Sequence, residues 1–143
     1  MSEYTVRGRI GHNVEHRIKL FDGRFDTAYR IKKFYLYPNE GIGAGNDSYG
    51  VLYTESGAVS SGLDWDWSEN EQIGWAGGVF GGGTTFSADG NGVVDPDNLI
   101  VEDLFVMANH GNSGETGYMI VMEKVNITDW QGALAMVRNR SQA

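Results

Sequence analysis

The sequence contains no cysteine, only two prolines and no long apolar run. The absence of cysteine excludes a disulfide framework, zinc sites built on thiolates and cysteine nucleophiles. A membrane-spanning helix needs about 20 consecutive apolar residues, and no stretch of this chain approaches that length, so we expect no membrane segment. The first ten residues, MSEYTVRGRI, have no apolar segment, so we expect no secretory signal.

Basic residues are also scarce and are distributed unevenly, within a net charge of −8. Residues 1–33 carry eight basic and four acidic residues, a net charge of +4, whereas residues 34–143 carry three and fifteen, a net charge of −12. A basic segment of this kind can indicate a nucleic-acid arm. Here the bases alternate with apolar residues, which favours one polar face of a sheet. We expect that face to meet acidic loops of the same fold or of an adjacent copy, and no nucleic acid.

Glycine is abundant, with 21 residues that cluster between short apolar runs, and this is typical of a turn-rich β protein. The length predicts a single domain covering residues 1–143. We expect strands near residues 3–10, 14–21, 27–37, 48–55, 63–67, 72–80, 99–109 and 118–127. Eight short strands separated by glycine-rich loops predict an all-β fold, an antiparallel β-sandwich of which a jelly roll is one form.

Local signals add detail to this prediction. The turn dipeptide Asp22-Gly23 predicts that residues 14–21 and 27–37 form a hairpin. Pro38 should end its strand, because proline donates no backbone hydrogen bond. The most apolar segments, 99–107 and 118–125, should form the centre of the core.

The last sixteen residues, 128–143, read TDWQGALAMVRNRSQA and predict one C-terminal α-helix. Thr128 and Gln131 match a capping box, and Trp130 begins an apolar face at helical spacing. Such a helix should dock on a sheet or on a neighbouring molecule.

Aromatic and acidic residues alternate in LDWDWSENE (63–71). Carboxylates beside aromatic rings can hydrolyse glycosides or bind sugars. Alternation on a strand offers a simpler interpretation, in which Leu63, Trp65 and Trp67 share one face. We favour packing in the core or in an interface, with Trp75 nearby. Sugar binding and catalysis remain the alternatives.

Other candidate motifs are weaker. GIGAGN (41–46) and GGVFGGG (77–83) lack the lysine and the following helix of a phosphate loop. The acidic loop 89–98 could bind calcium, although two Asx turns explain it more simply. One carboxylate of Glu102-Asp103 should face the apolar side, where it could pair with a base from the first 33 residues or lie at an interface. His12, His16 and His110 fit no metal site or catalytic triad, so we expect no enzyme, no catalytic residue, no metal and no cofactor.

Four segments resemble small virion proteins of tailed bacteriophages, especially marine ones. They are IKLFDGRF (18–25), YRIKKFYLYP (29–38), VDPDNLIVEDLFV (94–106) and EKVNITDWQGALAMVRNRSQ (123–142), about a third of the chain. The resemblance implies a structural subunit of the virion, made in the host cytoplasm. It would sit on the capsid as a decoration or cement protein, or in the tail.

These expectations define a protein that acts through contacts with its neighbours. Its partners would be the major capsid protein and copies of itself in a small homo-oligomer, a trimer being one form. The expected contact residues are Arg7, Arg9, Trp65, Trp67 and Trp130. The alternative is a carbohydrate-binding module for host attachment, with Trp65, Trp67 and Trp75 as its platform.

Overall fold

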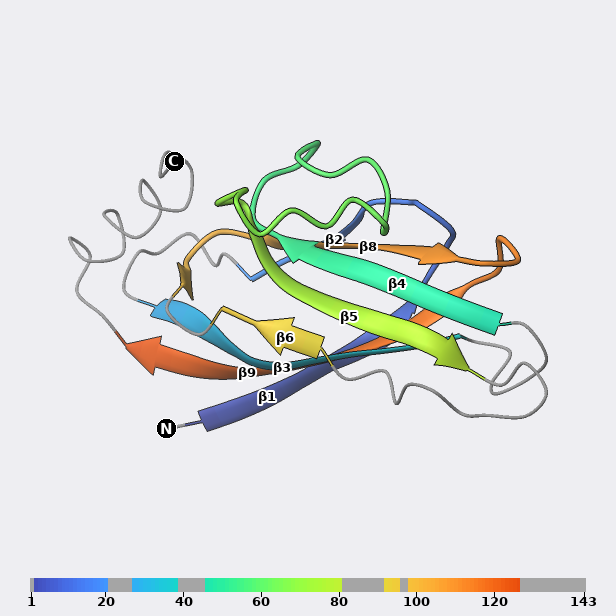
Figure 1. Cartoon of the computed structure of the whole chain (residues 1–143). Helices are drawn as coiled ribbons and strands as arrows, with labels where there is room; N and C mark the ends of the chain where they lie inside the picture. Colours follow the sequence, from blue (N-terminus) through green and yellow to red (C-terminus); the bar gives the residue numbers. More distant parts are fainter. Residues whose placement is uncertain (1, 21–26, 39–45, 81–91, 96–97, 127–143) are drawn as a thin grey trace.

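The computed structural model describes residues 2–20, 27–38, 46–80, 92–95 and 98–126. In these ranges the chain forms nine strands in two antiparallel sheets (Figure 1). The strands are β1 (Ser2–Ile10), β2 (His16–Ile18), β3 (Thr27–Pro38), β4 (Asn46–Tyr53), β5 (Gln72–Phe80), β6 (Gly92–Val94), β7 (Leu99–Ile100), β8 (Leu104–His110) and β9 (Thr116–Asn126). The all-β prediction is confirmed, and the two sheets are consistent with a sandwich. This part of the chain contains no helix that is long and apolar enough to cross a bilayer.

The first sheet, sheet 1, has the strand order β1-β9-β3-β7. Its middle strand β9 holds β1 on one side and β3 on the other, and two cross-strand rows of residues follow from this register. Arg7, Met119 and Tyr35 form one row, and Arg9, Gly117 and Tyr37 form the next. Because side chains alternate across a strand, both rows point to the same face of the sheet.

The second sheet, sheet 2, has the order β2-β8-β4-β5-β6. Its central strands are buried on both faces, as the almost unbroken burial of β8 shows. One face packs against sheet 1, and the other is covered by the chain that connects β4 to β5. This explains why Leu104–His110 is apolar throughout and does not alternate with polar residues.

The main core lies between the two sheets. It combines side chains from sheet 1, such as Phe34 and Ile120, with side chains from sheet 2, such as Leu52 and Leu104. The segments expected at the centre of the core do lie there, since Ile100, Val106, Tyr118 and Met122 belong to this cluster. A second, smaller cluster lies on the outer face of sheet 2 and consists of Val51, Tyr53, Val59, Trp75, Phe105 and Met107.

The predicted hairpin between residues 14–21 and 27–37 is wrong. β2 pairs with β8 in sheet 2, whereas β3 pairs with β9 and β7 in sheet 1. The turn dipeptide therefore connects two sheets and not two neighbouring strands. Pro38 does end β3, as predicted.

Two strand predictions also need correction. Residues 63–67 form turns and irregular chain and no strand, and residues 99–109 form two strands separated at residues 101–103. The short strand β6 was not predicted. The predicted C-terminal helix, residues 128–143, lies outside the described residues.

Candidate functional site

The connection between β4 and β5 is the longest described loop, and we call residues 54–71 the tryptophan loop. It has no strand or helix of its own, although connections in compact domains are commonly about 4–6 residues long. Figure 1 shows it folded above β4 and β8, on the side of sheet 2 that faces away from sheet 1. Long loops of this kind often carry a protein's function.

Two side chains from the β1–β2 connection hold the first half of the tryptophan loop. The Glu15 carboxylate accepts hydrogen bonds from the Tyr53 hydroxyl at 2.8 Å, the Ser56 hydroxyl at 2.6 Å and the Gly57 amide at 2.9 Å. Asn13, which has a left-handed backbone with φ of 52°, accepts a hydrogen bond from the Gly62 amide at 3.0 Å. Fixed partners at both points restrict the conformations open to the loop.

These bonds also set the protonation of the groups involved. Partial burial raises the pKa of Glu15, but the bonds from Gly57, Ser56 and Tyr53 together outweigh this and lower the pKa below its ordinary value of 4.5. Burial, followed by the hydrogen bond to the Glu15 carboxylate, raises the pKa of the Tyr53 phenol. The pair is therefore a stable neutral phenol donating to an ionised carboxylate.

Gln72, the first residue of β5, holds the second half of the loop. Its side-chain oxygen accepts hydrogen bonds from the Asp66 amide at 2.9 Å and from the Trp75 indole at 2.8 Å. Its side-chain nitrogen donates to the Asp64 carbonyl at 2.8 Å. The Gln72 side chain is buried, and it satisfies two backbone groups of the loop and the indole of Trp75.

The loop nevertheless exposes large apolar side chains. Leu63, Trp65 and Trp67 are 58%, 42% and 72% exposed, whereas Trp75 is only 7% exposed. The Trp65 indole donates to the Gly62 carbonyl at 2.8 Å and meets the Tyr49 ring edge-on at 6.2 Å. Trp65 and Trp67 therefore do not pack in the core of the chain, because both lie on the surface of a fixed loop, and packing in an interface stays a prediction.

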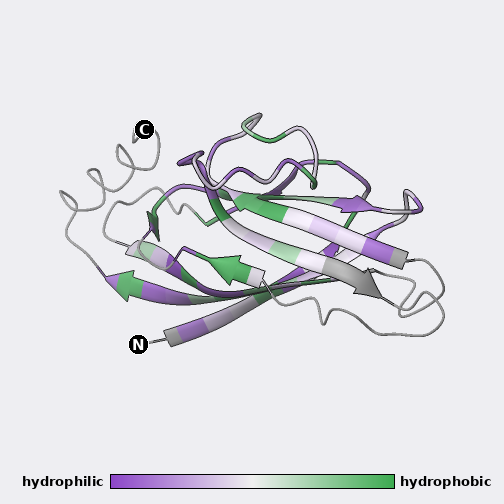
Figure 2. Ribbon diagram, in the orientation of Figure 1, coloured by the Kyte–Doolittle hydropathy of each residue, from purple (hydrophilic) through white to green (hydrophobic). Residues whose placement is uncertain are grey.

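The tryptophan loop is also strongly acidic. It contains five carboxylates and no basic residue, and Figure 2 shows hydrophobic and strongly hydrophilic residues intermixed along it. Repulsion from Glu71, with smaller effects of slight burial and of Asp66 and Asp64, raises the pKa of Glu69. Hydrogen bonds from the Ser68 hydroxyl and amide lower the pKa of Asp66. The negative charges are thus close enough to repel one another.

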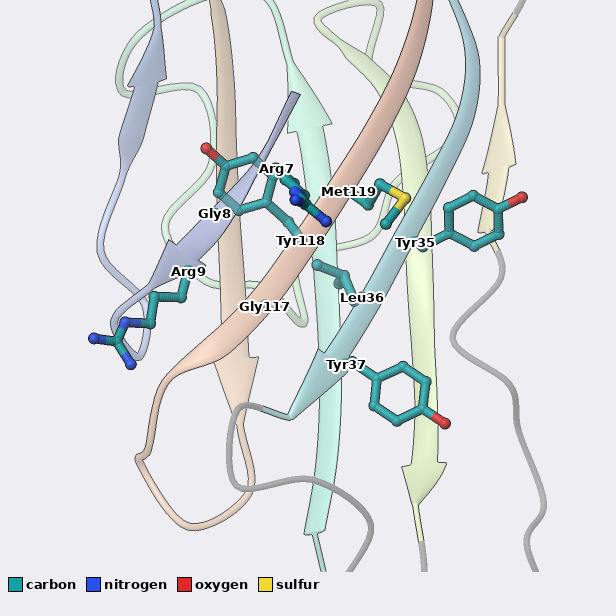
Figure 3. Close-up of a pocket in the computed structure, with 9 residues that line it drawn as sticks. All are labelled: Arg7, Gly8, Arg9, Tyr35, Leu36, Tyr37, Gly117, Tyr118 and Met119. Atoms are coloured by element: carbon teal, nitrogen blue, oxygen red, sulfur yellow. The ribbon is translucent and has the colours of Figure 1, made fainter. Parts of the chain in front are cut away.

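A second candidate surface lies on the outer face of sheet 1. It is a groove of about 540 Å³ across β1, β9 and β3, which we call the sheet-1 groove. In Figure 3, Arg7 and Arg9 from β1 and Tyr35 and Tyr37 from β3 lie on either side of β9, which contributes Gly117 and Met119. The hollow exists because Gly117 places no side chain between Arg9 and Tyr37.

The face that carries the sheet-1 groove is basic. Arg9 pairs weakly with Glu115 at 3.7 Å, and both side chains are more than half exposed. Arg7 makes no ion pair with any residue that the structure describes. The carboxylate of Glu123 lies on β9, two outward-facing rows beyond Met119. It is buried and lies 3.7 Å from Arg30 and 3.9 Å from Lys32. The lining of the groove contains Arg7, Arg9 and no acid, which leaves the groove with net positive charge.

The structure thus places four of the five predicted contact residues on two surfaces. Arg7 and Arg9 line the sheet-1 groove, and Trp65 and Trp67 lie on the tryptophan loop. Trp130 lies outside the described residues. The sequence reasoning missed Tyr35, Tyr37, Gly117 and Met119, although the alternation in YLYP already indicated two tyrosines on one face.

The other candidate motifs resolve as follows. Asp103 is 8% exposed and accepts hydrogen bonds from Arg17 at 2.5 Å and from the Leu20 amide at 3.0 Å, so the predicted pairing with an early base is confirmed. In the acidic loop, Asn98 donates to Asp95 at 2.6 Å, while most of residues 89–97 lie outside the described residues. Among the side chains that the structure describes, no three metal-binding groups lie close enough to share an ion. Residues 41–45 and 81–83 of the glycine-rich motifs also lie outside the described part.

No protein-family model, curated protein or solved structure matches this chain.

Proposed function

We propose that this protein is a structural component of a tailed-phage particle, a capsid decoration or cement protein that stabilises the particle by contacts between subunits. Its partners in this proposal are the major capsid protein and further copies of the chain. The observation that carries the proposal is the fixed tryptophan loop, which exposes Leu63, Trp65 and Trp67 within one short stretch of chain. Exposed apolar clusters on an otherwise folded chain are typical of surfaces that another molecule covers.

The anchoring of this loop supports a contact role. Glu15, Asn13 and Gln72 hold it before any partner arrives. A surface that is already ordered loses less conformational entropy on binding, so more of its contact energy appears as affinity. Tryptophan is also among the residues that contribute most to protein interfaces.

The strand order supports a jelly roll as the finer architecture within the same proposal. The C-terminal helix at residues 128–143 belongs to the proposal through its sequence alone. The chain alternates between the sheets in its first three strands, and its last strand β9 returns beside β1 while β8 returns beside β2. Jelly rolls are common in viral capsid proteins and in lectins. Fold alone does not choose between these functions, so the choice depends on the surfaces.

A carbohydrate-binding module is the second candidate, favoured by the 72% exposure of Trp67 next to the carboxylates of its loop. Its three-tryptophan platform is weakened by two observations. Trp75 is buried, and the Trp67 and Trp75 rings, 5.8 Å apart, are inclined by 55°. A sugar platform needs open rings in one plane.

The decisive experiment asks whether the chain is part of the particle. Virions of the phage that encodes it are purified, and the chain is identified and counted by quantitative mass spectrometry. We expect copies in the hundreds, as in a capsid lattice. A handful of copies would indicate the tail, and absence from the particle would contradict the proposal.

A second measurement concerns the tryptophan loop. Trp67→Ala should fold normally, because the side chain is mostly exposed, yet it should bind the assembled particle at least about 30-fold more weakly, as expected for a central interface tryptophan worth about 2 kcal/mol. Glu55→Gln, on the same loop, is the matched control. Two results together would favour the carbohydrate-binding alternative. Trp67→Ala would still bind the particle, and wild type would bind host glycans.

A further inference from the structure

The sheet-1 groove combines positive charge with an apolar floor. Arg7 and Arg9 supply the charge, while Tyr35, Tyr37 and Met119 supply apolar surface. Adjacent strands are about 4.8 Å apart, so Arg9 and Tyr37 lie roughly 10 Å apart across Gly117. A partner that fills this hollow should carry negative charge beside a flat apolar group.

The chain itself contains a segment with these properties. On the tryptophan loop, Trp67 is the most exposed of the tryptophans that the structure describes, and Asp66 and Glu69 lie close to it in sequence. The raised pKa of Glu69 shows that the loop's negative charges are crowded. Arginine from a partner would relieve that repulsion, and its guanidinium can also stack on an indole.

The two surfaces cannot meet within one molecule. The tryptophan loop covers the outer face of sheet 2, where Val59 packs on Tyr53 and Phe105 in the smaller apolar cluster. The sheet-1 groove lies on the outer face of sheet 1. Figure 1 shows the two sheets as separate layers with the loop beyond sheet 2, and the main core lies between the layers, so the loop of one chain can reach only the groove of another.

We propose that the tryptophan loop of one copy docks in the sheet-1 groove of the next copy, with Trp67 over Gly117 and the loop carboxylates against Arg7 and Arg9. This inference rests on the proposed function, because it names a sister copy as a partner. An apolar cavity of about 150 Å³ already accommodates benzene. The groove, at about 540 Å³, therefore has room for the indole.

Such a contact is heterologous, because it joins two different patches. Heterologous contacts form closed rings when the rotation between copies closes, and open chains when it does not. Because the loop and the groove lie on opposite faces of the molecule, two copies cannot make both contacts at once, so each dimer retains one free loop and one free groove. This property separates the proposal from a symmetric dimer.

The first test measures the mass of the purified full chain by light scattering over a range of concentrations. We expect wild type to form species larger than dimers. Trp67→Ala removes the docking side chain, and Gly117→Leu fills the hollow. A Cβ at residue 117 would lie 3.6 Å from the nearest backbone oxygen, so this position tolerates a side chain. Each variant alone should be monomeric, whereas Lys19→Glu, a charge reversal on an exposed residue away from the groove, should assemble like wild type.

The second test mixes the two defective variants. Gly117→Leu still has a working loop, and Trp67→Ala still has a working groove, so the mixture should form a one-to-one dimer and stop there. Circular dichroism confirms that each variant is folded. A monomeric wild type, a dimer of Gly117→Leu with itself, or no complex in the mixture would each overturn the proposal.

A third arm separates the groove's partner from a free anion. A fluorescent heparin-derived oligosaccharide is titrated into wild type and Gly117→Leu. Tight binding of this probe by a wild type that stays monomeric overturns docking of a sister copy. The chain can still be present in virions in that case, so failure here is distinct from failure of the proposed function.

Discussion

At the scale of single residues, Glu15 is a main anchor of the tryptophan loop. Its carboxylate accepts bonds from Tyr53, Ser56 and Gly57. The net effect is a lowered pKa, which means that the folded state prefers the ionised form. Glu15 therefore stabilises the fold above its unfolded pKa, and this contribution is lost as the pH falls through the lower, folded pKa.

We predict that Glu15→Gln lowers the free energy of unfolding at neutral pH by about 1–2 kcal/mol, because a neutral amide accepts these bonds less strongly. The variant should also lose part of the acid-dependent destabilisation that wild type shows below about pH 4.5. Urea unfolding at a series of pH values measures both effects. Glu55→Gln is the control, and an equal loss in both variants would mean that the bonds to Glu15 contribute little.

Single residues were predictable where a sequence pattern reports a local property. The alternation in the first strand placed Arg7 and Arg9 on one polar face, and the acid inside an apolar run led to the Arg17–Asp103 pair. Gly117 was not predictable as part of a site. Its effect arises from its neighbours across two strands, Arg9 and Tyr37, and no local pattern contains that register.

At the scale of elements, the tryptophan loop shows how alternation can mislead. LDWDW has the period of a strand, but its hydrogen bonds go to side chains and turns. Gln72 binds the backbone of residues 64 and 66, and the Asp66 side chain accepts from the Ser68 amide. These hydrogen bonds, and not the alternation of residue types, decided the conformation. The pairing of β2 was missed for a similar reason. Its three residues pair with β8, which lies far away in the sequence, so no local pattern indicates this partner.

Gly62 fixes the base of this loop against sheet 2. A Cβ there would lie 2.2 Å from the Asn109 amide nitrogen and 2.4 Å from the Tyr49 carbonyl oxygen, both backbone atoms that cannot rotate away. We predict that Gly62→Ala lowers the free energy of unfolding by at least about 2 kcal/mol. Trp65 should also become more mobile, because its indole is bonded to Gly62.

The matched control is Gly117→Ala, an identical change on a strand with ordinary contacts. It should leave stability unchanged or raise it by a few tenths of a kcal/mol, because alanine loses less backbone entropy than glycine. Thermal unfolding and tryptophan fluorescence anisotropy compare the two variants. Similar melting temperatures would show that the close approach at Gly62 is relieved by a small shift of the loop.

At the scale of the whole molecule, the uneven charge of the sequence becomes a separation in space. Arg7, Arg9 and Arg30 lie on the outer face of sheet 1, while the acids of the tryptophan loop lie beyond sheet 2. The composition predicted a basic sheet face and acidic loops. It could not predict that they lie on opposite sides, because that follows from the topology of the two sheets.

We predict that self-association of wild type weakens with salt and with acid. Screening shortens the range of the attraction from about 10 Å at 0.1 M to about 3 Å at 1 M ionic strength. Since neighbouring carboxylates raise the pKa of Glu69 above 4.5, this group takes up a proton earlier than an ordinary glutamate as the pH falls. A cationic partner favours its ionised form, so association should be strongest above that pKa and decline below it.

Sedimentation equilibrium across salt concentration and pH measures this dependence. Glu69→Gln should flatten the acid response of association. It should not destabilise the fold, because the charge of Glu69 is repelled by Glu71 in the folded chain. Association that strengthens with salt would instead indicate an interface dominated by apolar burial.

The open position at Gly117 also has a consequence for inheritance. In the proposed assembly, a bulky side chain there would close the hollow without disturbing the core, so a single amino-acid replacement would abolish assembly in a chain that still folds. Such a chain keeps a working tryptophan loop and would cap the growing end of a wild-type assembly. In a cell that makes both chains, the defective one would therefore act dominantly.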